Sequence, residues 1–218
     1  MISPSSVISD LLGPNVVGYE VRSKGYIPPV FSQEEEMIRN SCVSRREHFS
    51  LGRACARSAL SCFGYTSFPV IADKKRAPIW PSDLVGSISH ADGYCAVALA
   101  RKDHYLGLGI DVETIGKLDI EAWPLVFTQA EIETLNALCM PCKSAMATIM
   151  FSAKEAFYKC QYQVTKSWVG FKDVELEVTD NEFLVKGVDG YKTSHLVNTS
   201  PVGRFRLIDE YAFTAISV

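Results

Sequence analysis

The segments FSQEEEMI (residues 31–38) and FTQAEIET (residues 127–134) are near-copies of one another in opposite halves of the chain. Each is followed, about twenty residues later, by a second helical pattern and then by strand-like sequence. The same order of elements in both halves predicts an internal duplication, with its boundary near Thr114–Lys117. We therefore predict an α+β fold with a pseudo-twofold pair of similar lobes, residues 1–114 and 115–218, each with helices packed on a small, mostly antiparallel sheet.

Capping residues and alternation predict the elements of each half. A Ser or Thr followed three residues later by Glu indicates a helix start, and this pattern occurs at Ser32 with Glu35, Ser44 with Glu47, and Thr128 with Glu131. The second helical patterns are LGRACARSALSCF (51–63) and MFSAKEAFYKCQY (150–162). Strands are predicted at LVGSISH (84–90), YCAVALA (94–100), YLGLGIDVE (105–113), FKDVELEV (171–178), EFLVKGV (182–188) and YAFTAISV (211–218).

The bulk composition narrows the class of protein. The net charge of −3 gives no general attraction for nucleic acid, so an anion site must be a local cluster. The N-terminus lacks a signal-peptide pattern, and no apolar run reaches the ~20 residues of a membrane span. Seven cysteines, an odd number, favour reduced thiols and a cytoplasmic location. Cys139 and Cys142 lack the second pair or nearby His expected of a zinc site, which favours their interpretation as two small residues around a proline turn.

The stretch GLGIDVE (107–113) places two carboxylates on a face that is otherwise glycine. Side chains alternate along a strand, so Asp111 and Glu113 share a face with Gly107 and Gly109. Carboxylate oxygens on an open face are suitable ligands for Mg²⁺, which is held by one or two carboxylates plus substrate phosphates. The alternative is an ordinary amphipathic strand whose polar face meets solvent.

The stretch FSAKEAFYK (151–159) predicts a helix with an apolar core stripe; that stripe is Met150, Ala153, Phe157 and Cys160. Glu155 and Lys159, four residues apart, lie at the margin of a second, aromatic stripe. They are either a surface ion pair of little energetic value or a metal carboxylate and a phosphate-directed ammonium. Lys154 adds positive charge, although it points elsewhere on the helix.

Further cations lie in the first half. In SRREHFSLGRACARSAL (44–60), Arg46, Arg53 and Arg57 share one helical stripe and Arg45 lies off it. Such a stripe is either a solvated face or a face that binds phosphate, since guanidinium groups match phosphate oxygens.

A loop and a hairpin add other candidate phosphate contacts. Lys74, Lys75 and Arg76 are followed by Pro78 and Pro81, which indicates that the three cations lie on a stiffened loop. Ser89 and His90 end a strand beside a predicted hairpin turn, where the imidazole either satisfies a backbone acceptor or donates to a phosphate. Acidic groups and clustered cations together are suited to phosphoryl chemistry.

Four motifs, RAPIWP (76–81), GSISH (86–90), GIDVE (109–113) and FSAKEAFYK (151–159), resemble those of the 4'-phosphopantetheinyl transferases of the surfactin and enterobactin type. The resemblance covers roughly residues 31–175. It implies a pseudo-dimeric fold and transfer of the phosphopantetheine arm of coenzyme A to a serine of an apo acyl, peptidyl or aryl carrier protein. It also implies Mg²⁺, with Mn²⁺ as an alternative, and release of adenosine 3',5'-bisphosphate.

The resemblance assigns roles to the acidic motifs. It implies that Asp111, Glu113 and Glu155 bind the metal in a cleft between the lobes. Asp111, Glu155 and Lys159 are then the catalytic residues, with Glu155 deprotonating the carrier serine directly or through a water, and Lys159 neutralising the pyrophosphate.

The resemblance also implies a coenzyme A site. Arg53 and His90 would hold the 3'-phosphate together with Arg45, which the family spacing favours, whereas the helical wheel favours Arg46. The other coenzyme A residues implied are Lys75, Arg76, Ser89, Asp111, Lys154, Glu155 and Lys159.

The partners follow from the same resemblance. Phe151, at a position where surfactin-type members carry Trp, favours the enterobactin-like branch and hence siderophore or nonribosomal peptide synthesis. We expect a cytoplasmic monomer without nucleic-acid partners, and a carrier that docks by an acidic helix near Trp168 and Phe171, unless both aromatics are core. Two alternatives stay open: another Mg²⁺-dependent enzyme that cleaves pyrophosphates, and a catalytically idle protein that binds coenzyme A or a carrier.

Overall fold

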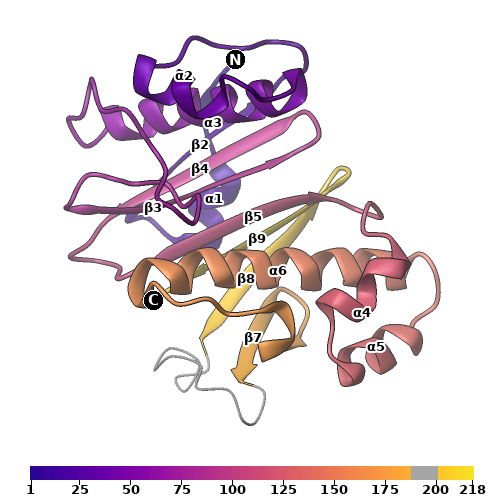
Figure 1. The fold of residues 1–218 in the computed structure, drawn as a ribbon. Coiled ribbons are helices and arrows are strands. Elements are labelled where there is room, and N and C mark those ends of the chain that lie inside the picture. Colours follow the sequence, from indigo (N-terminus) through magenta and orange to yellow (C-terminus); the bar gives the residue numbers. More distant parts are fainter. Residues whose placement is uncertain (188–200) are drawn as a thin grey trace. The chain divides into compact units, whose positions relative to one another are not determined.

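The computed structural model describes residues 1–187 and 201–218, and the chain divides into two compact units, Met1–Leu106 and Gly107–Val218 (Figure 1). Each unit has one antiparallel sheet with helices packed on it, so the predicted α+β class is confirmed. The predicted boundary after Thr114 is wrong, because the strand that contains GIDVE pairs along its whole length with the last strand of the chain. The twofold relation between the lobes stays a prediction.

The first unit is built on a four-stranded antiparallel sheet in the order β1-β2-β4-β3. Its strands are β1 (Ser3–Pro4), β2 (Val16–Arg22), β3 (Leu84–Ala91) and β4 (Tyr94–Arg101). Its helices are α1 (Ser6–Leu12), α2 (Ser32–Ile38) and α3 (Val43–Ser61). The predicted hairpin of LVGSISH and YCAVALA is confirmed as β3 and β4, whereas α1 and β2 were not predicted.

Helix α3 packs against β2 and β4, and small residues allow this close packing. Cys55, Ala56 and Ala59 are completely buried on the side of the helix that meets the sheet. Gly52 belongs to the same surface, because a Cβ placed on it would lie 3.1 Å from Ile88 Cγ2 of β3. A bulky side chain in place of Cys55, Ala56 or Ala59 would push the helix away from its sheet.

The second unit has a five-stranded antiparallel sheet in the order β5-β9-β8-β7-β6. Its strands are β5 (Leu108–Thr114), β6 (Val174–Val178), β7 (Glu182–Gly187), β8 (Val202–Ile208) and β9 (Tyr211–Ser217). Its helices are η1 (Ile120–Ala122), α4 (Trp123–Val126), α5 (Gln129–Asn136), α6 (Cys142–Thr165) and η2 (Phe171–Asp173). Strand β8 was not predicted, and Val188, the last residue of the predicted strand EFLVKGV, lies outside the described residues.

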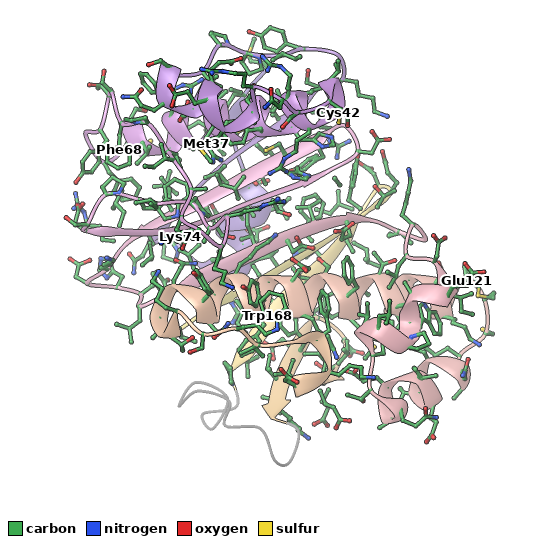
Figure 2. All side chains as sticks on the ribbon, in the orientation of Figure 1. Met37, Cys42, Phe68, Lys74, Glu121 and Trp168 are labelled. Carbon is green, nitrogen blue, oxygen red and sulfur yellow. The ribbon has the colours of Figure 1, made fainter. Side chains whose placement is uncertain are left out.

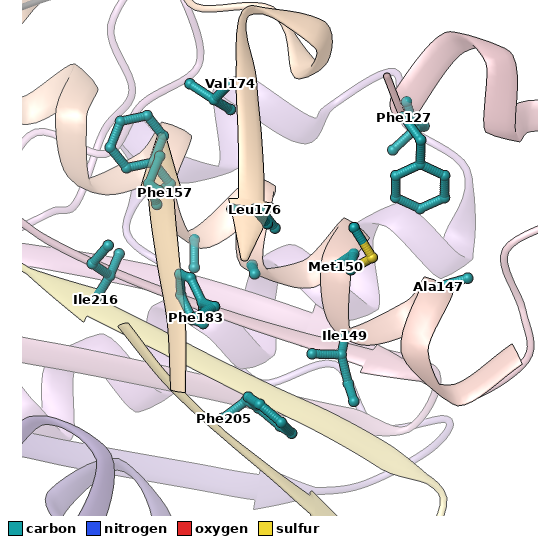
Figure 3. Packing of buried hydrophobic residues seen from close by; sticks show 14 of the residues in the cluster. Phe127, Ala147, Ile149, Met150, Phe157, Val174, Leu176, Phe183, Phe205 and Ile216 are labelled. Carbon is teal, nitrogen blue, oxygen red and sulfur yellow. The ribbon is translucent and has the colours of Figure 1, made fainter. Parts of the chain in front are cut away.

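Helix α6 lies on β5 and β9 and supplies the core of the second unit (Figures 1 and 3). Met150, Ala153, Phe157 and Cys160 are all at least 98% buried, which confirms the predicted apolar stripe. Figure 3 shows Phe157 and Met150 among the side chains that the sheet contributes, including Phe183. The burial of this stripe fixes the rotation of α6 about its axis, and therefore which side chains face β5.

One of the three predicted capping boxes is present. Thr128 Oγ1 accepts from Glu131 N at 3.3 Å, and Glu131 Oε2 accepts from Thr128 N at 2.9 Å. The other two predictions are wrong. Ser32 is the first residue of α2, after its cap residue Phe31, and Ser44 lies within α3, which begins at Val43.

Helix α2 is nevertheless capped by a carboxylate, that of Glu34 and not the predicted Glu35. Glu34 Oε2 accepts from Phe31 N at 3.0 Å and from Arg57 Nη1 at 3.3 Å. Its Oε1 accepts from Val70 N at 2.8 Å, and the side chain is completely buried. A single carboxylate therefore joins α2, α3 and the segment before β3.

Glu131 in the second unit makes the same set of bonds. Its Oε2 accepts from Thr128 N and from Lys154 Nζ, the latter at 2.7 Å, and its Oε1 accepts from Leu176 N at 2.9 Å. In both units one carboxylate oxygen accepts hydrogen bonds from the backbone N–H at the helix start and from a cation on the long helix. The other oxygen accepts from a backbone N–H that is distant in the sequence. This shared arrangement supports the predicted internal duplication.

Candidate active site

The glycine face of β5 is covered by helix α6. A Cβ on Gly109 would lie 1.9 Å from Ala156 O, and a Cβ on Gly107 would lie 2.6 Å from Cys160 O. The glycines therefore admit the helix backbone, so the part of the predicted open face that Gly107 and Gly109 form is covered by α6. The solvent-facing alternative is wrong, because Asp111 on the same face is only 3% exposed.

The acidic end of this strand face, at Asp111, contacts Lys159 of α6, one of the predicted site residues. Lys159 Nζ lies 2.6 Å from Asp111 Oδ1 and donates also to Ile110 O at 3.2 Å. Glu155 lies one helical turn before Lys159, and Glu113 follows Asp111 at the next position on the same strand face. The three carboxylates and the ammonium group act electrostatically on one another, so the structure brings Asp111, Glu113, Glu155 and Lys159 together.

Burial and like charge shift the protonation of this cluster. Burial, and then the charges of Asp111 and Glu155, raise the pKa of Glu113 to about 8, against the opposing effect of Lys159. Burial also raises the pKa of Glu155, with Lys159 opposing and Asp111 adding to the shift. Burial alone would lower the pKa of Lys159, but the neighbouring carboxylates, Asp111 first, raise it. The cluster therefore has more negative charge than its one ammonium group balances.

The donor chemistry fits a divalent cation, although the side chains do not already form a cage. Within residues 1–187 and 201–218, no three His, Cys, Asp or Glu side chains stand in positions that hold a metal ion. Three carboxylates with one ammonium nevertheless offer oxygen ligands and a surplus of negative charge, which Mg²⁺ and Mn²⁺ prefer.

Lys154 is not a coenzyme A ligand, and that prediction is wrong. Its Nζ donates to Glu131 Oε2 at 2.7 Å and to three backbone carbonyls, those of Phe171 at 2.7 Å, Val174 at 3.0 Å and Val126 at 3.2 Å. The residue is 2% exposed. Burial lowers its pKa and Glu131 opposes that shift. This ammonium is fully used inside the unit, so it has no capacity left for a phosphate.

The arginines of α3 divide into two pairs. Arg46 donates to Ile38 O at 3.1 Å and pairs with Glu35 at 2.5 Å, and Arg57 pairs with Glu34. Both are therefore engaged with α2. Arg45 and Arg53, the pair that the family spacing favours, make none of these bonds to α2, and their role in anion binding stays a prediction.

Arg53 is unusual because its guanidinium is buried. It is 7% exposed, it stacks 4.1 Å from the centre of the Phe49 ring, and its Nε has no hydrogen-bond partner among the described residues. Burial lowers the pKa of Arg53 to about 10, with Glu34 opposing and Arg45 adding to the shift. A buried donor that lacks an acceptor is costly, so this position suits an anionic ligand.

The other first-unit candidates lie on β3 and on a tight loop. Ser89 is 3% exposed, and the ring of His90 stacks on that of His48 from α3, with 4.7 Å between centres. His48 was not among the residues predicted from the sequence. The cationic loop is shaped by Asp73, whose Oδ1 accepts from Lys75 N at 2.8 Å and from Ala77 N at 3.0 Å.

The predicted docking residues have different surroundings. Trp168 is 73% exposed (Figure 2) and meets the Tyr158 ring edge-on at 5.2 Å. Phe171 instead packs against the core of the second unit and against Phe151, at 5.6 Å. Of the two, Trp168 alone is presented to solvent as a large apolar surface.

Two properties of the whole described chain complete the site description. All seven cysteines are free thiols, with Cys139 and Cys142 exposed. Among the described residues, no helix combines the length and apolar character that crossing a bilayer requires.

Two family models match the chain, one for each unit. Residues 33–100 match the 4'-phosphopantetheinyl transferase N-terminal domain, and residues 107–214 match the 4'-phosphopantetheinyl transferase superfamily. The second match begins at the first residue of the second unit. The matched regions together contain every candidate residue described above.

Named relatives agree with these matches. The 4'-phosphopantetheinyl transferase Npt of Nocardia iowensis is 33% identical over 199 residues, which are 84% of this chain and 87% of that protein. The 4'-phosphopantetheinyl transferase PptT of Mycobacterium tuberculosis is 34% identical over 66% of this chain and 63% of its own. Enterobactin synthase component D of Escherichia coli K12 is 36% identical over 61% of each chain.

The chain belongs to the 4'-phosphopantetheinyl transferase family, the enzymes that move the phosphopantetheine arm of coenzyme A to carrier proteins.

Proposed function

We propose that this protein uses Asp111, Glu113, Glu155 and Lys159 to transfer phosphopantetheine from coenzyme A to a serine of an apo carrier protein, releasing adenosine 3',5'-bisphosphate. The convergence of these four side chains from β5 and α6 carries the proposal. The two alternatives, a different pyrophosphate-cleaving enzyme and an idle binding protein, do not account for the match to transferase models over both units.

Asp111, Glu113 and Glu155 are the proposed ligands of Mg²⁺ or Mn²⁺. Such an ion, when bound, supplies positive charge that polarises the pyrophosphate of coenzyme A. Because Mg²⁺ is commonly held by one or two carboxylates together with substrate phosphates, three ready-made protein ligands are not required before substrate binds.

Glu155 is the proposed base for the carrier serine. A serine hydroxyl is a weak nucleophile and needs a proton acceptor within hydrogen-bond reach. The raised pKa of Glu155, caused mainly by burial, makes its carboxylate a stronger base than a solvated one. It accepts the proton directly or through a water.

Lys159 is the proposed electrostatic stabiliser of the leaving group. Its pKa is raised by Asp111, Glu155 and Glu113, so it stays charged at neutral pH. Negative charge builds on the pyrophosphate oxygens as the bond to the bisphosphate breaks, and a nearby fixed ammonium lowers the energy of that state.

The first unit supplies the proposed nucleotide contacts. Arg45, Arg53 and His90 hold the 3'-phosphate, while Ser89 and the loop residues Lys75 and Arg76 flank the ribose and adenine. The buried guanidinium of Arg53, whose Nε has no partner among the described residues, is the observation in favour.

The carrier is proposed to dock at the surface around Trp168. The exposed indole provides an apolar contact, and Lys166, whose ammonium lies 5.2 Å from the centre of the Tyr162 ring, provides positive charge for an acidic helix. The named enterobactin synthase relatives favour a siderophore or nonribosomal peptide carrier. The seven free thiols favour a cytoplasmic location. We also propose that the protein is a monomer, because one chain contains both the proposed nucleotide contacts and the acidic cluster.

One experiment tests the transferase proposal. Purified protein is incubated with coenzyme A, Mg²⁺ and an apo carrier domain, and the intact mass of the carrier is measured. We expect a gain of one phosphopantetheine arm. A pyrophosphate-cleaving enzyme would instead consume coenzyme A without a gain in carrier mass, and an idle binder would leave both unchanged.

Two substitutions test the assigned residues in the same assay. Asp111→Asn and Glu155→Gln keep the shapes of the side chains and remove their charges, so we expect turnover to fall by at least about a hundredfold while circular dichroism stays that of the wild type. Wild-type turnover in Asp111→Asn would show that the metal assignment is incorrect.

A further inference from the structure

Two histidines from different elements of the first unit stack on each other. The rings of His48 on α3 and His90 on β3 are 4.7 Å apart between centres and inclined by only 21°. Both side chains are partly buried. Stacked imidazoles are disfavoured when both are charged, unless an anion lies beside them.

The packing of α3 on β3 brings this pair together. Gly52 meets Ile88, with 3.1 Å from its would-be Cβ to Ile88 Cγ2. His48 lies four residues before Gly52, about 6 Å along the helix, and His90 lies two residues after Ile88, about 6.6 Å along the strand. The two steps match, so the close approach at Gly52 places His48 opposite His90.

Two arginines, Arg45 and Arg53, lie on the same helix as His48. Arg45 precedes His48 by three residues and is therefore its neighbour on the helix surface. The charge of Arg45 acts on the buried guanidinium of Arg53, whose Nε lacks a partner among the described residues. Glu34 is the charged group with the largest electrostatic effect on Arg53, and its carboxylate is already bonded to Arg57 and to two backbone N–H groups. Arg45 and the Nε of Arg53 therefore provide cationic donors on the helix that carries His48.

We propose that His48 is a second imidazole donor to the 3'-phosphate, acting beside His90. The inference rests on the proposed function for the nature of the ligand. Two nearly parallel rings direct their N–H groups in nearly parallel planes, so both can donate to oxygens of one phosphate monoester. Charge-assisted hydrogen bonds of this kind discriminate strongly between a ligand with the phosphate and one without it.

The test compares two nucleotides that differ only in the 3'-phosphate. Calorimetry gives the affinities of adenosine 3',5'-bisphosphate and adenosine 5'-monophosphate for the wild type, His48→Phe and His48→Gln. We expect His48→Phe, which keeps a ring to stack on His90 and lacks the N–H, to lower the affinity ratio by about tenfold. His48→Gln, which keeps an N–H, should retain more of the ratio than His48→Phe.

The matched control is His104→Gln at an exposed histidine of the same unit, which should leave the ratio unchanged. A wild-type ratio in His48→Phe overturns the inference, because stacking alone would then explain the contact. An equal loss of both affinities overturns it too, since that indicates a structural role.

The outcome is separable from that of the carrier assay. Carrier labelling with an unchanged ratio in His48→Phe refutes the inference alone. A lowered ratio in a protein that labels no carrier refutes the transferase proposal and supports the phosphate contact.

Discussion

The two lysines of FSAKEAFYK differ in what surrounds them. Lys154 is enclosed by one carboxylate and three carbonyl groups, whereas Lys159 reaches a buried aspartate among further acidic groups. The sequence shows two lysines on one helix. It does not reveal which ammonium group is buried and fully hydrogen-bonded inside the folded unit. That distinction depends on the rotation of α6 and on segments distant in sequence.

The pKa of Glu113 predicts a dependence of stability on pH. Its value rises from 4.5 to about 8 on folding, so between these pH values the folded protein keeps a proton that the unfolded chain has released. Without divalent cations, stability should therefore fall as pH rises through this window, by an amount on the order of a few kcal/mol.

Urea unfolding of the metal-free protein at about pH 5 and about pH 9 measures this difference. Glu113→Gln carries no titrating proton at this position, so its stability should fall less between the two pH values. An equal fall in the variant and the wild type would contradict the raised pKa.

At the scale of elements, the contact between β5 and α6 is made by backbone against backbone. Gly109 is where this contact is tightest. We predict that Gly109→Ala destabilises the protein by about 3 kcal/mol, because the new methyl group meets the carbonyl oxygen of Ala156, which cannot move without the helix.

Gly52→Ala is the matched control. Its Cβ meets the Cγ2 methyl group of Ile88 at 3.1 Å, a contact that a shift of a few tenths of an ångström relieves, and alanine gains about 1 kcal/mol of helix propensity over glycine. The melting temperature of Gly52→Ala should stay close to that of the wild type, while Gly109→Ala melts well below it. Similar melting temperatures for both variants would argue against the tight contact.

Loss of the buried carboxylate should lower the free energy of unfolding more at Glu131 than at Glu34. Glu131→Gln leaves the ammonium of Lys154, whose side chain is 1% exposed, without its counter-charge, and should cost about 3–5 kcal/mol. Glu34→Gln should cost less, because the Arg57 side chain is 27% exposed and water can solvate it.

Denaturant titration of both variants measures the difference. The double variant Glu131→Gln/Lys154→Met should recover part of the stability lost in Glu131→Gln, since it removes the unpaired charge. A double variant less stable than Glu131→Gln would show that the carbonyl contacts of Lys154, and not its charge, dominate.

At the scale of the whole molecule, the sequence predicted the class of fold and the GIDVE strand but placed that strand in the wrong unit. Alternation reveals that a segment is a strand, whereas pairing with β9 joins residues about a hundred positions apart and leaves no local signal. Strands β2 and β8 were missed as well, because their sequences VVGYEVR and VGRFRLI contain a glycine and charged residues, which weaken the strand pattern.

The candidate site was predictable in part. The acidic cluster of the second unit comes from two contiguous motifs, so its residues could be found from the sequence. His48 could not, because its significance depends on the packing of α3 against β3. Lys154 was assigned to coenzyme A because the sequence does not show that Glu131 lies beside it.

Trp168 gives a prediction about the partner. Trp168→Ala removes an exposed indole and leaves the acidic cluster intact, so it should raise the KM for the carrier about tenfold and leave the KM for coenzyme A unchanged. Steady-state kinetics with each substrate varied in turn checks this. A change confined to the KM for coenzyme A would exclude Trp168 as a docking residue.

The shared bonding of Glu34 and Glu131 affects how the two halves are compared. Matching the letters of FSQEEEMI and FTQAEIET pairs Glu131 with Glu35, whereas the hydrogen bonds pair it with Glu34. A residue-by-residue superposition of the repeats therefore needs a one-position offset here. The same bonding role therefore belongs to an acid one position earlier in the first segment, and equivalent residues of the two units are identified by their bonding partners rather than by aligning the letters of the two segments.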